Sequence, residues 1–380
     1  MVLYSDKEGH RVARVQAVWG GAPPTEAAKQ WATYPLSHPI VKAAMNRRAT
    51  GDVERDAYHR LKIQMTEWGF TVPLMRVASL CCGAGSLERQ LVEIGLIQQC
   101  VGYDLATGAL DAARQEAETH CLHGLSYDQR DLERDGLGVS GLDLVLAHQG
   151  VHHLERLEDV FDAVNDALAP GGIFHLHEFV GADRFQWPDR QIEEMTAWLQ
   201  SLPERYQRTS TGLLKTCAGR ATIEEMMAYD PSEAVRSSAI ERLIAERFEI
   251  VERRELGGTL AMMALADIGQ NFDPDSPEDV AHLQRLLDRE ERLIASGELG
   301  SDFVVITARK RGMAPLAELQ YGHSTHGKPA CYGSVVTQPA SVRPSHARHS
   351  LRKPLLQHLN LGLQLRALKR FFRRLFISES

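Results

Sequence analysis

The sequence predicts an α/β fold built on a doubly wound parallel sheet. Short, nearly continuous apolar runs alternate with segments of helical periodicity between residues 74 and 179. Strands of that composition are buried on both faces, which a parallel sheet achieves with helices on either side. A glycine-containing loop, "CCGAG", joins the first apolar run to a helical pattern, at the place where such sheets commonly bind ligands.

The elements follow one another in the order that such a sheet requires. Helical patterns at 86–95, 106–119 and 155–168 each lie between two apolar runs, and "APGG" ends the third of them. The run at 124–133 is more polar than the others but falls where a third strand is needed. The predicted strands are residues 74–80, 100–104, 124–133, 142–147, 172–179, 248–253 and 301–310.

The pattern also divides the chain into parts. An amphipathic helix is predicted over 52–69 and a buried helix over 257–269. Residues 179–247 are too many for a simple crossover, so we expect a helical insertion there. The parts are a helical lead-in (1–70), the sheet domain (71–311), a Pro-, Ser- and His-rich linker (312–350) and a basic amphipathic helix (351–380).

Composition narrows the class of protein. With 380 residues, 43% apolar and 24% charged, the chain is close to average soluble globular proteins. Its six cysteines form no Cys-x-x-Cys pair, and its first residues lack the apolar core of a signal peptide. No apolar run approaches the roughly 20 residues of a membrane-spanning helix. We therefore expect a reduced, cytoplasmic protein that does not cross a membrane.

The loop after the first strand is the predicted ligand site. Gly83 and Gly85 let the main chain approach a ligand, and the next helix points free amide groups at it. The Gly-x-Gly-x-x-Gly pattern of dinucleotide-binding proteins needs a third glycine where this chain has Glu88, whose charge would repel a pyrophosphate. A nicotinamide-dependent enzyme is therefore disfavoured. Asp104 ends the second strand, where a carboxylate can accept hydrogen bonds from both ribose hydroxyls, and Asp131 follows the third, placed to meet an adenine amino group.

Five segments in order carry a resemblance to a known family. They are "VASLCCGAGSLERQL", "VGYDLATGALDAAR", "RDLE", "LDLVLAHQGVHHL" and "LAPGGIFHLHEFVG", and together they resemble the motifs of class I S-adenosylmethionine-dependent methyltransferases over about residues 75–310. The resemblance implies a Rossmann-like, seven-stranded sheet whose last strand is antiparallel, and S-adenosylmethionine as cofactor. The cofactor-binding residues that it implies are Ser79, Cys81, Gly83, Gly85, Asp104, Leu105, Asp131, Leu132 and His148.

Two residues of the loop depart from the family pattern. Family members usually carry an acid at the position of Ser79 and a glycine at that of Cys81. The missing acid leaves the methionyl ammonium group of the cofactor without its usual partner. Cys81 and Cys82 are interpreted as packing residues, with a reactive thiol as the alternative.

The candidate catalytic residues follow the fourth strand and end the fifth. His152, His153 and Glu178 lie where an acceptor is expected, and each could take a proton from an acceptor hydroxyl. The alternatives are packing for the two histidines and a hydrogen-bonded structural role for Glu178.

Three other histidines raise the question of a metal. His175 and His177 share one face of a strand and could join His148 around an ion. Packed histidines are more frequent than such sites, so we predict no metal.

The segment after the fifth strand is the candidate acceptor lid. Arg184, Gln186 and Trp187 leave the strand over the expected acceptor position, although Trp187 could equally be buried. Farther along, "DPSEAVRSSAI" reads as a helix start capped by Asp230, with Glu233 closing a capping box. That interpretation leaves three residues to face the acceptor: Arg236, Ser237 and Ser238.

The end of the chain is basic. From Leu319 onward ten Lys and Arg stand against one acid, so this part carries +9 and the rest −16 of the total charge of −7. Apolar residues recur in steps of three and four over 361–376, with basic residues between them. Such a helix could lie on an anionic membrane surface, or dock on the acidic body of the protein or on a partner. No recognised nucleic-acid-binding motif accompanies it, which argues against a nucleic acid as partner.

Together these interpretations predict an enzyme. It transfers a methyl group from S-adenosylmethionine to a small-molecule or saccharide acceptor, at a hydroxyl in preference to carbon or nitrogen. We expect it in the cytoplasm, with peripheral contact at the inner membrane surface through 361–376 as one use of the tail. The alternative is a catalytically weak, cofactor-binding sensor or scaffold protein tethered by its basic tail.

Overall fold

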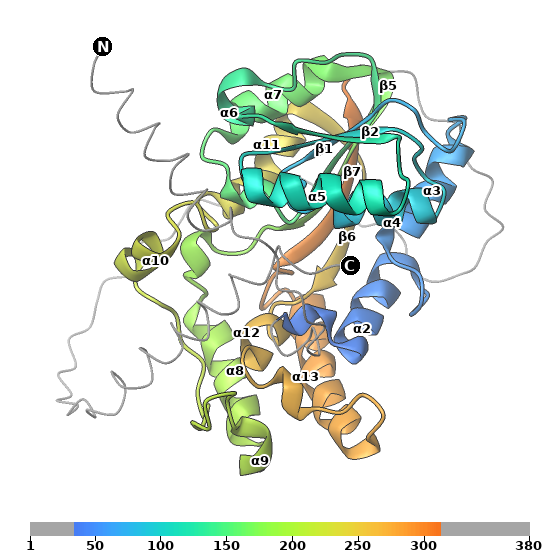
Figure 1. The fold of residues 1–380 in the computed structure, drawn as a ribbon. Coiled ribbons are helices and arrows are strands. Elements are labelled where there is room, and N and C mark those ends of the chain that lie inside the picture. Colours follow the sequence, from blue (N-terminus) through green and yellow to red (C-terminus); the bar gives the residue numbers. More distant parts are fainter. Residues whose placement is uncertain (1–33, 313–380) are drawn as a thin grey trace.

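A computed structural model describes residues 34–312, and these form the predicted doubly wound sheet (Figure 1). Seven strands lie in the order β3-β2-β1-β4-β5-β7-β6. β1 to β5 pair in parallel, and β7, the last strand, runs antiparallel to both neighbours. The strands are β1 Val77–Leu80, β2 Cys100–Asp104, β3 Leu125–Gln129, β4 Leu142–His148, β5 Leu168–Phe179, β6 Phe248–Gly257 and β7 Phe303–Lys310.

Helices cover both faces of this sheet. Leu144 and Leu146 of β4 pack toward α3 and α4, whereas Val145 between them packs toward α7 and α11. This alternation explains why the strands read as continuous apolar runs. The helices are α2 Pro39–Thr50, α3 Ala57–Glu67, α4 Ser86–Glu93, α5 Thr107–Thr119, α6 Leu132–Asp135, α7 Leu157–Ala167, α8 Asp189–Gln200, α9 Glu204–Gln207, α10 Ile223–Tyr229, α11 Ile240–Arg247, α12 Ala261–Leu265 and α13 Pro277–Ala295.

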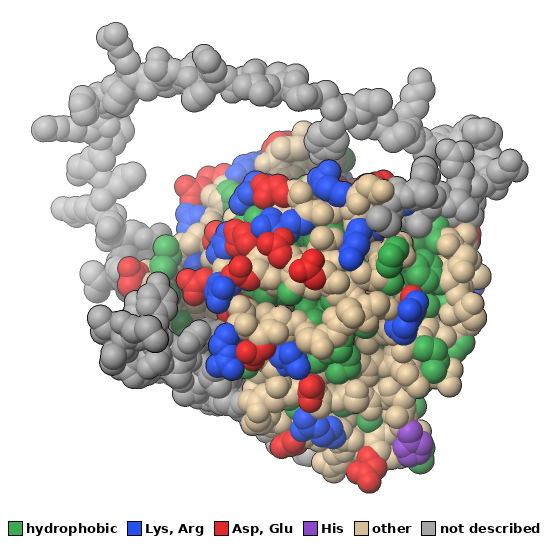
Figure 2. Space-filling model, turned by 90° about the horizontal axis from the view of Figure 1, so that it is seen from above, with side chains coloured by type: hydrophobic (Ala, Val, Ile, Leu, Met, Phe, Trp, Pro, Cys, Tyr) green, Lys and Arg blue, Asp and Glu red, His purple; other side chains and the backbone are tan. Residues whose placement is uncertain are grey.

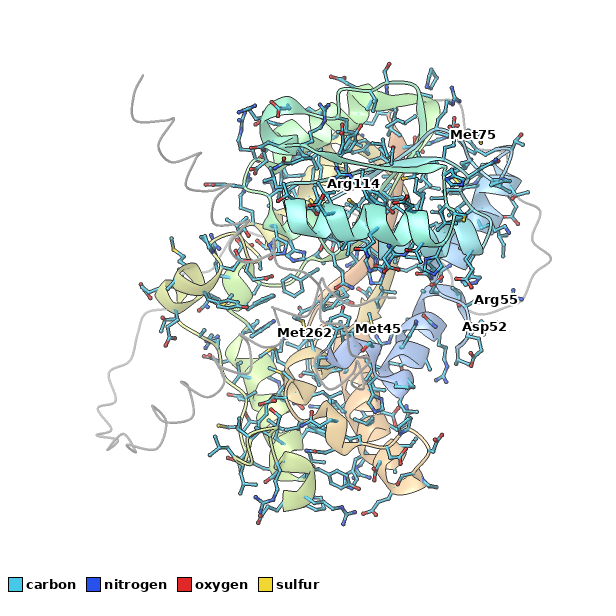
Figure 3. All side chains as sticks on the ribbon, in the orientation of Figure 1. Met45, Asp52, Arg55, Met75, Arg114 and Met262 are labelled. Atoms are coloured by element: carbon cyan, nitrogen blue, oxygen red, sulfur yellow. The ribbon has the colours of Figure 1, made fainter. Side chains whose placement is uncertain are left out.

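A second apolar core lies beside the sheet, below it in Figure 1, where α2, α8, α12 and α13 meet. Met45 of α2 and Met262 of α12 are labelled in Figure 3 and belong to this core. The burial of Met262 agrees with the buried helix predicted over 257–269. Trp187 is 2% exposed and stacks on Phe185 with ring centroids 5.0 Å apart. The insertion therefore buries Trp187 in its own packing.

Three expectations about helices need correction. The helix predicted over 257–269 is only α12, Ala261–Leu265, and the long α13 after it was not predicted. No helix begins at Asp230: its Oδ1 accepts from the N–H of Ser232, and the chain continues as a turn. The capping box is instead formed by Thr222 and Glu225 at the start of α10.

The surface mixes charges of both signs. Acidic and basic side chains are interspersed on the face shown in Figure 2, and pairs such as Arg247 with Asp162 bring them into contact. Within residues 34–312, no helix combines the length and apolar character needed to span a membrane. The predicted basic helix at 351–380 lies outside the described residues.

Candidate functional site

The loop between β1 and α4 has the geometry of a ligand cradle. Gly83 and Gly85 have φ of +53° and +76°, in the left-handed region that favours glycine. The N–H of Gly83 donates to Asp104 Oδ2 at 2.8 Å, and Oδ1 accepts from the N–H of Ala106 at 2.8 Å. Burial raises the pKa of Asp104, and these amides oppose that rise. The carboxylate at the end of β2 is thus fixed against the loop, and its contact with a ribose stays a prediction.

Two close contacts under the loop require glycine. A Cβ on Gly85 would lie 2.4 Å from Tyr127 Oη, so this glycine makes room for a side chain of β3. A Cβ on Gly150 would lie 2.5 Å from the Cβ of Cys81, which has φ of +52°. Gly150 therefore accommodates the cysteine that replaces the usual loop glycine. Burial raises the pKa of the Cys81 and Cys82 thiols well above their usual value, which favours packing over reactivity.

Ser79 and Glu88 are both buried, at 1% and 0% exposure. Burial raises the pKa of Glu88 to about 7. The expectation that this carboxylate would face a pyrophosphate is wrong, because a fully buried side chain does not reach the open side of the loop. The case against a dinucleotide rests on the missing third glycine alone.

Three further predicted cofactor-binding residues, with Asp131 expected at the adenine, lie at the neighbouring strand ends. Asp131 caps the first turn of α6, its Oδ1 accepting from the N–H two residues on at 3.2 Å. Leu132 is buried, and the carbonyl of Leu105 accepts from the Gln129 side chain at 3.2 Å. Because β2 and β3 pair in parallel, these residues share one edge of the sheet with Asp104.

The predicted catalytic residues His152 and Glu178 are held in a buried hydrogen-bond network. Glu178 is 0% exposed, and its Oε2 accepts from the N–H groups of Gly150 and Val151, both at 2.9 Å. Its Oε1 accepts from His152 Nδ1 at 2.5 Å and from the N–H of Phe179 at 2.6 Å. Four donors satisfy this carboxylate, which favours the structural alternative for Glu178.

The two adjacent histidines differ in charge. His152 Nε2 lies 3.4 Å from Glu233 Oε1. Burial opposes protonation of His152, but the carboxylates of Glu178 and Glu233 outweigh it and raise its pKa to about 10. His152 is therefore protonated at neutral pH in this arrangement and does not act as a base. Burial lowers the pKa of His153, whose Nδ1 faces Ser232 Oγ at 3.1 Å. His153 remains the candidate base of this pair.

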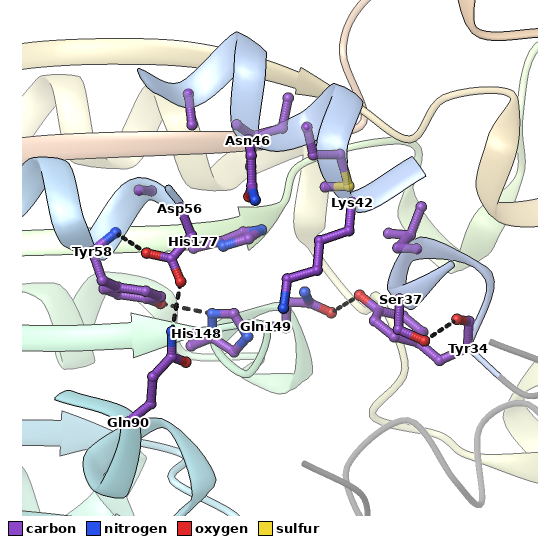
Figure 4. Close-up of a pocket in the computed structure, with 15 residues that line it drawn as sticks. Tyr34, Ser37, Lys42, Asn46, Asp56, Tyr58, Gln90, His148, Gln149 and His177 are labelled. Atoms are coloured by element: carbon purple, nitrogen blue, oxygen red, sulfur yellow. Dashed lines mark hydrogen bonds between the residues drawn. The ribbon is translucent and has the colours of Figure 1, made fainter. Parts of the chain in front are cut away.

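A cavity of about 130 Å³ opens at the carboxyl ends of β4 and β5 (Figure 4). His148 and His177 line it with ring centroids 4.7 Å apart, edge to face. Tyr58 of α3 reaches across it, its hydroxyl 2.7 Å from His148 Nδ1. Burial lowers the pKa of His177 well below its usual value, so its imidazole is neutral. The cavity brings a hydroxyl and two imidazoles together at the carboxyl edge of the sheet.

The lead-in supplies ten of the fifteen residues that line this cavity, Tyr58, Asp56 and Lys42 among them, and none of the fifteen comes from 180–247. The candidate lid residues make other contacts. Arg184 donates to the carbonyl of Pro231, Gln186 to that of Ala221, and Ser237 to that of Gly181, while Arg236 pairs with Glu158 and the N–H of Ser238 donates to Asp183. The acceptor lid over 179–247 stays a prediction.

Residues 79–176, which span β1 to β5 and the loop, match a family model described as a methyltransferase domain. Residues 79–176 therefore belong to a methyltransferase domain. S-adenosylmethionine is the cofactor of the family. The residues fit it, since Gly83 adds no side chain to the loop and its N–H holds the Asp104 carboxylate against it.

The methyltransferase domain has relatives of known name. Sterol 24-C-methyltransferase of Candida albicans is 25% identical over 168 residues, which are 43% of this chain and 42% of the relative. That of Aspergillus fumigatus is 28% identical over 112 residues, 29% of each chain. The matches thus span under half the length of these relatives. Among solved structures, geranyl diphosphate C-methyltransferase from Streptomyces coelicolor A3(2) is 14% identical with a TM-score of 0.39, covering 77% of this chain and 90% of that one.

Proposed function

We propose that this methyltransferase domain transfers the methyl group of S-adenosylmethionine to a hydroxyl of a small-molecule or saccharide acceptor. The observation that carries the proposal is the cavity at the ends of β4 and β5, where Tyr58 and His148 meet at 2.7 Å. An acceptor hydroxyl bound there would have a base within hydrogen-bond reach.

Different residues of the chain hold the cofactor and activate the acceptor. When bound, the cofactor supplies an electrophilic methyl group, so the protein contributes binding and orientation. Asp104 and the Gly83 loop hold the nucleoside at the ends of β1 and β2. We assign the base to His148, which lines the cavity, in place of His153, which does not. His148 takes the proton of the acceptor hydroxyl, and the Tyr58 hydroxyl fixes the orientation of that imidazole. Placement of the acceptor oxygen about 3 Å from the methyl group accounts for much of the rate.

The relatives support a small-molecule acceptor and raise a second candidate for the acceptor atom. They are named sterol 24-C-methyltransferases, so a carbon acceptor is the alternative to a hydroxyl. The base in the cavity favours the hydroxyl, because an alcohol must lose its proton at or before attack.

Location and the tail complete the proposal. We place the protein in the cytoplasm, with the segment 361–376 contacting the inner membrane surface. Flotation of the full chain with anionic liposomes, against a version ending near residue 345, tests this contact. Equal recovery of the two would remove it.

Activity is tested with the purified full chain, labelled S-adenosylmethionine and fractionated small-molecule extracts. We expect a labelled product heavier by one CH2 group, carrying an O-methyl group, and its loss in His148→Ala but not in the exposed control His120→Ala. A C-methyl product would move the acceptor from hydroxyl to carbon. Cofactor binding without any transfer would favour the sensor or scaffold alternative.

A further inference from the structure

Three side chains with metal-binding atoms converge beside the end of β4, and the cavity described above does not include them. They are His152 and His153 of the 3-10 turn η3 (Val151–His153) and Glu233 of the insertion, with one ligand atom each within 4.8 Å of the others. Glu233 is 1% exposed, and its Oε2 has no hydrogen-bond partner in the described structure. The capping-box interpretation of Glu233 is wrong, so the burial of this carboxylate needs another reason.

The surroundings orient both imidazoles toward Glu233. Glu178 holds His152 at Nδ1, at 2.5 Å, and Ser232 Oγ lies 3.1 Å from Nδ1 of His153. The Nε2 atoms then lie 3.4 Å and 4.0 Å from the two oxygens of Glu233. Metal-binding histidines are typically fixed in this way, with the second ring nitrogen bonded to a carboxylate or another polar group.

We propose that His152, His153 and Glu233 bind a divalent transition-metal ion of the zinc class. Two imidazoles and one carboxylate are a ligand set that zinc takes with its fourth position open. In a tetrahedral zinc site the ligand atoms lie about 3.4 Å apart, the distance already found between His152 and Glu233, so only the wider separations shorten on binding. The ion takes the place of the proton between His152 and Glu233.

The ion would join two distant parts of the chain. Glu233 lies in the turn after α10, and η3 follows β4. These segments already touch, since the N–H of Val235 donates to the carbonyl of His152 at 3.1 Å. A metal here fastens the insertion to the carboxyl edge of the sheet, close to the cofactor loop.

The test uses the full chain, stripped of metal with a chelator and titrated with Zn²⁺ and with Co²⁺. Metal content by mass spectrometry, the visible absorption of bound Co²⁺ and the thermal unfolding midpoint are compared among variants. Glu233→Gln and His153→Ala each remove one ligand, and Ser232→Ala removes only a supporting contact. His120→Ala is the matched control, since His120 is an exposed histidine at the end of α5. Any metal bound by the remaining histidines is the same in all variants and cancels in the comparison.

We expect wild type and His120→Ala to bind one equivalent of metal ion more than Glu233→Gln and His153→Ala do. Zn²⁺ should raise the unfolding midpoint only in the proteins that bind this extra equivalent. Ser232→Ala should keep the equivalent with affinity weakened about 10-fold. Equal metal content in wild type and the two ligand variants would overturn the proposal. The proposal would also be overturned if Zn²⁺ left the unfolding midpoint of wild type unchanged. The three side chains would then form only an ion pair.

Discussion

Replacing Asp104 by asparagine should weaken cofactor binding strongly while leaving the fold intact. The carboxylate accepts the N–H groups of Gly83 and Ala106, each at 2.8 Å. The asparagine side chain would offer one oxygen and one NH2 group, so one of these amides would face a donor. A ribose hydroxyl that donates to a charged carboxylate contributes about 1.5–3 kcal/mol to binding, and asparagine removes that charge. We therefore expect Kd for adenosylhomocysteine to rise about 10- to 100-fold.

Isothermal titration calorimetry of the full chain measures this directly. Asp128→Asn is the matched control, since Asp128 lies exposed on β3 beside the site and changes charge equally. Circular dichroism and the thermal unfolding midpoint establish that both variants fold. If Asp104→Asn binds adenosylhomocysteine within about twofold of wild type, the assignment of Asp104 to the ribose is refuted.

Three further predictions concern stability and catalysis. Glu88→Gln should be more stable than wild type by up to about 3 kcal/mol at about pH 8, and equally stable near pH 4. The pKa of Glu88 is raised from 4.5 to about 7 in the folded state, so wild type loses stability as the pH rises through that window. Urea unfolding at a series of pH values measures this difference. Gly150→Ala should destabilise the protein by about 1–3 kcal/mol in urea unfolding, and Cys81→Gly should rescue it, because the added methyl group meets the Cβ of Cys81. Tyr58→Phe should lower kcat of methyl transfer about 10-fold with KM for the cofactor unchanged, because it removes the hydroxyl from the base; steady-state kinetics measure it.

Each of these has a control or a contrary outcome. Glu93→Gln on the exposed side of α4 should show no pH-dependent gain, and a gain equal to that of Glu88→Gln would point to net charge instead. A double variant Gly150→Ala with Cys81→Gly as unstable as the single alanine variant would place the clash elsewhere. An unchanged kcat in Tyr58→Phe would remove the Tyr58 hydroxyl from the reaction.

The sequence predicted the sheet and the cofactor edge because these depend on local patterns. Continuous apolar runs identify strands buried on both faces, and the spacing of Gly83, Gly85 and Asp104 follows from the loop and strand that place them. The family match to residues 79–176 and the observed strand order confirm the fold class. S-adenosylmethionine as the cofactor followed from the same motifs.

The cavity could not be predicted in the same way. Residues 1–50 lack clean periodicity, so there was no signal for Tyr34, which precedes the 3-10 turn Pro35–Ser37, or for Lys42 of α2. Tyr58 meets His148 across 90 positions of sequence, and only tertiary packing brings them together. The helix that follows Asp56 was predicted. Its position facing the end of β4 was not, because that position depends on the path of the preceding chain.

Glu233 is a different case: the local sequence matched a helix-capping motif, but tertiary contacts place the side chain elsewhere. "DPSE" fits a helix cap, yet the carboxylate of Glu233 turns inward to His152 and His153. The protonated, buried His152 attracts a buried carboxylate more strongly than one backbone amide at a solvated helix start does.

The most direct test of the account is a crystal structure of the full chain grown with adenosylhomocysteine. The nucleoside should lie over the loop at Gly83 with both ribose hydroxyls on the Asp104 carboxylate and its sulfur toward the cavity at His148. A nucleoside bound elsewhere on the chain, or a side chain filling that loop with Asp104 directed away from the ribose, would contradict it.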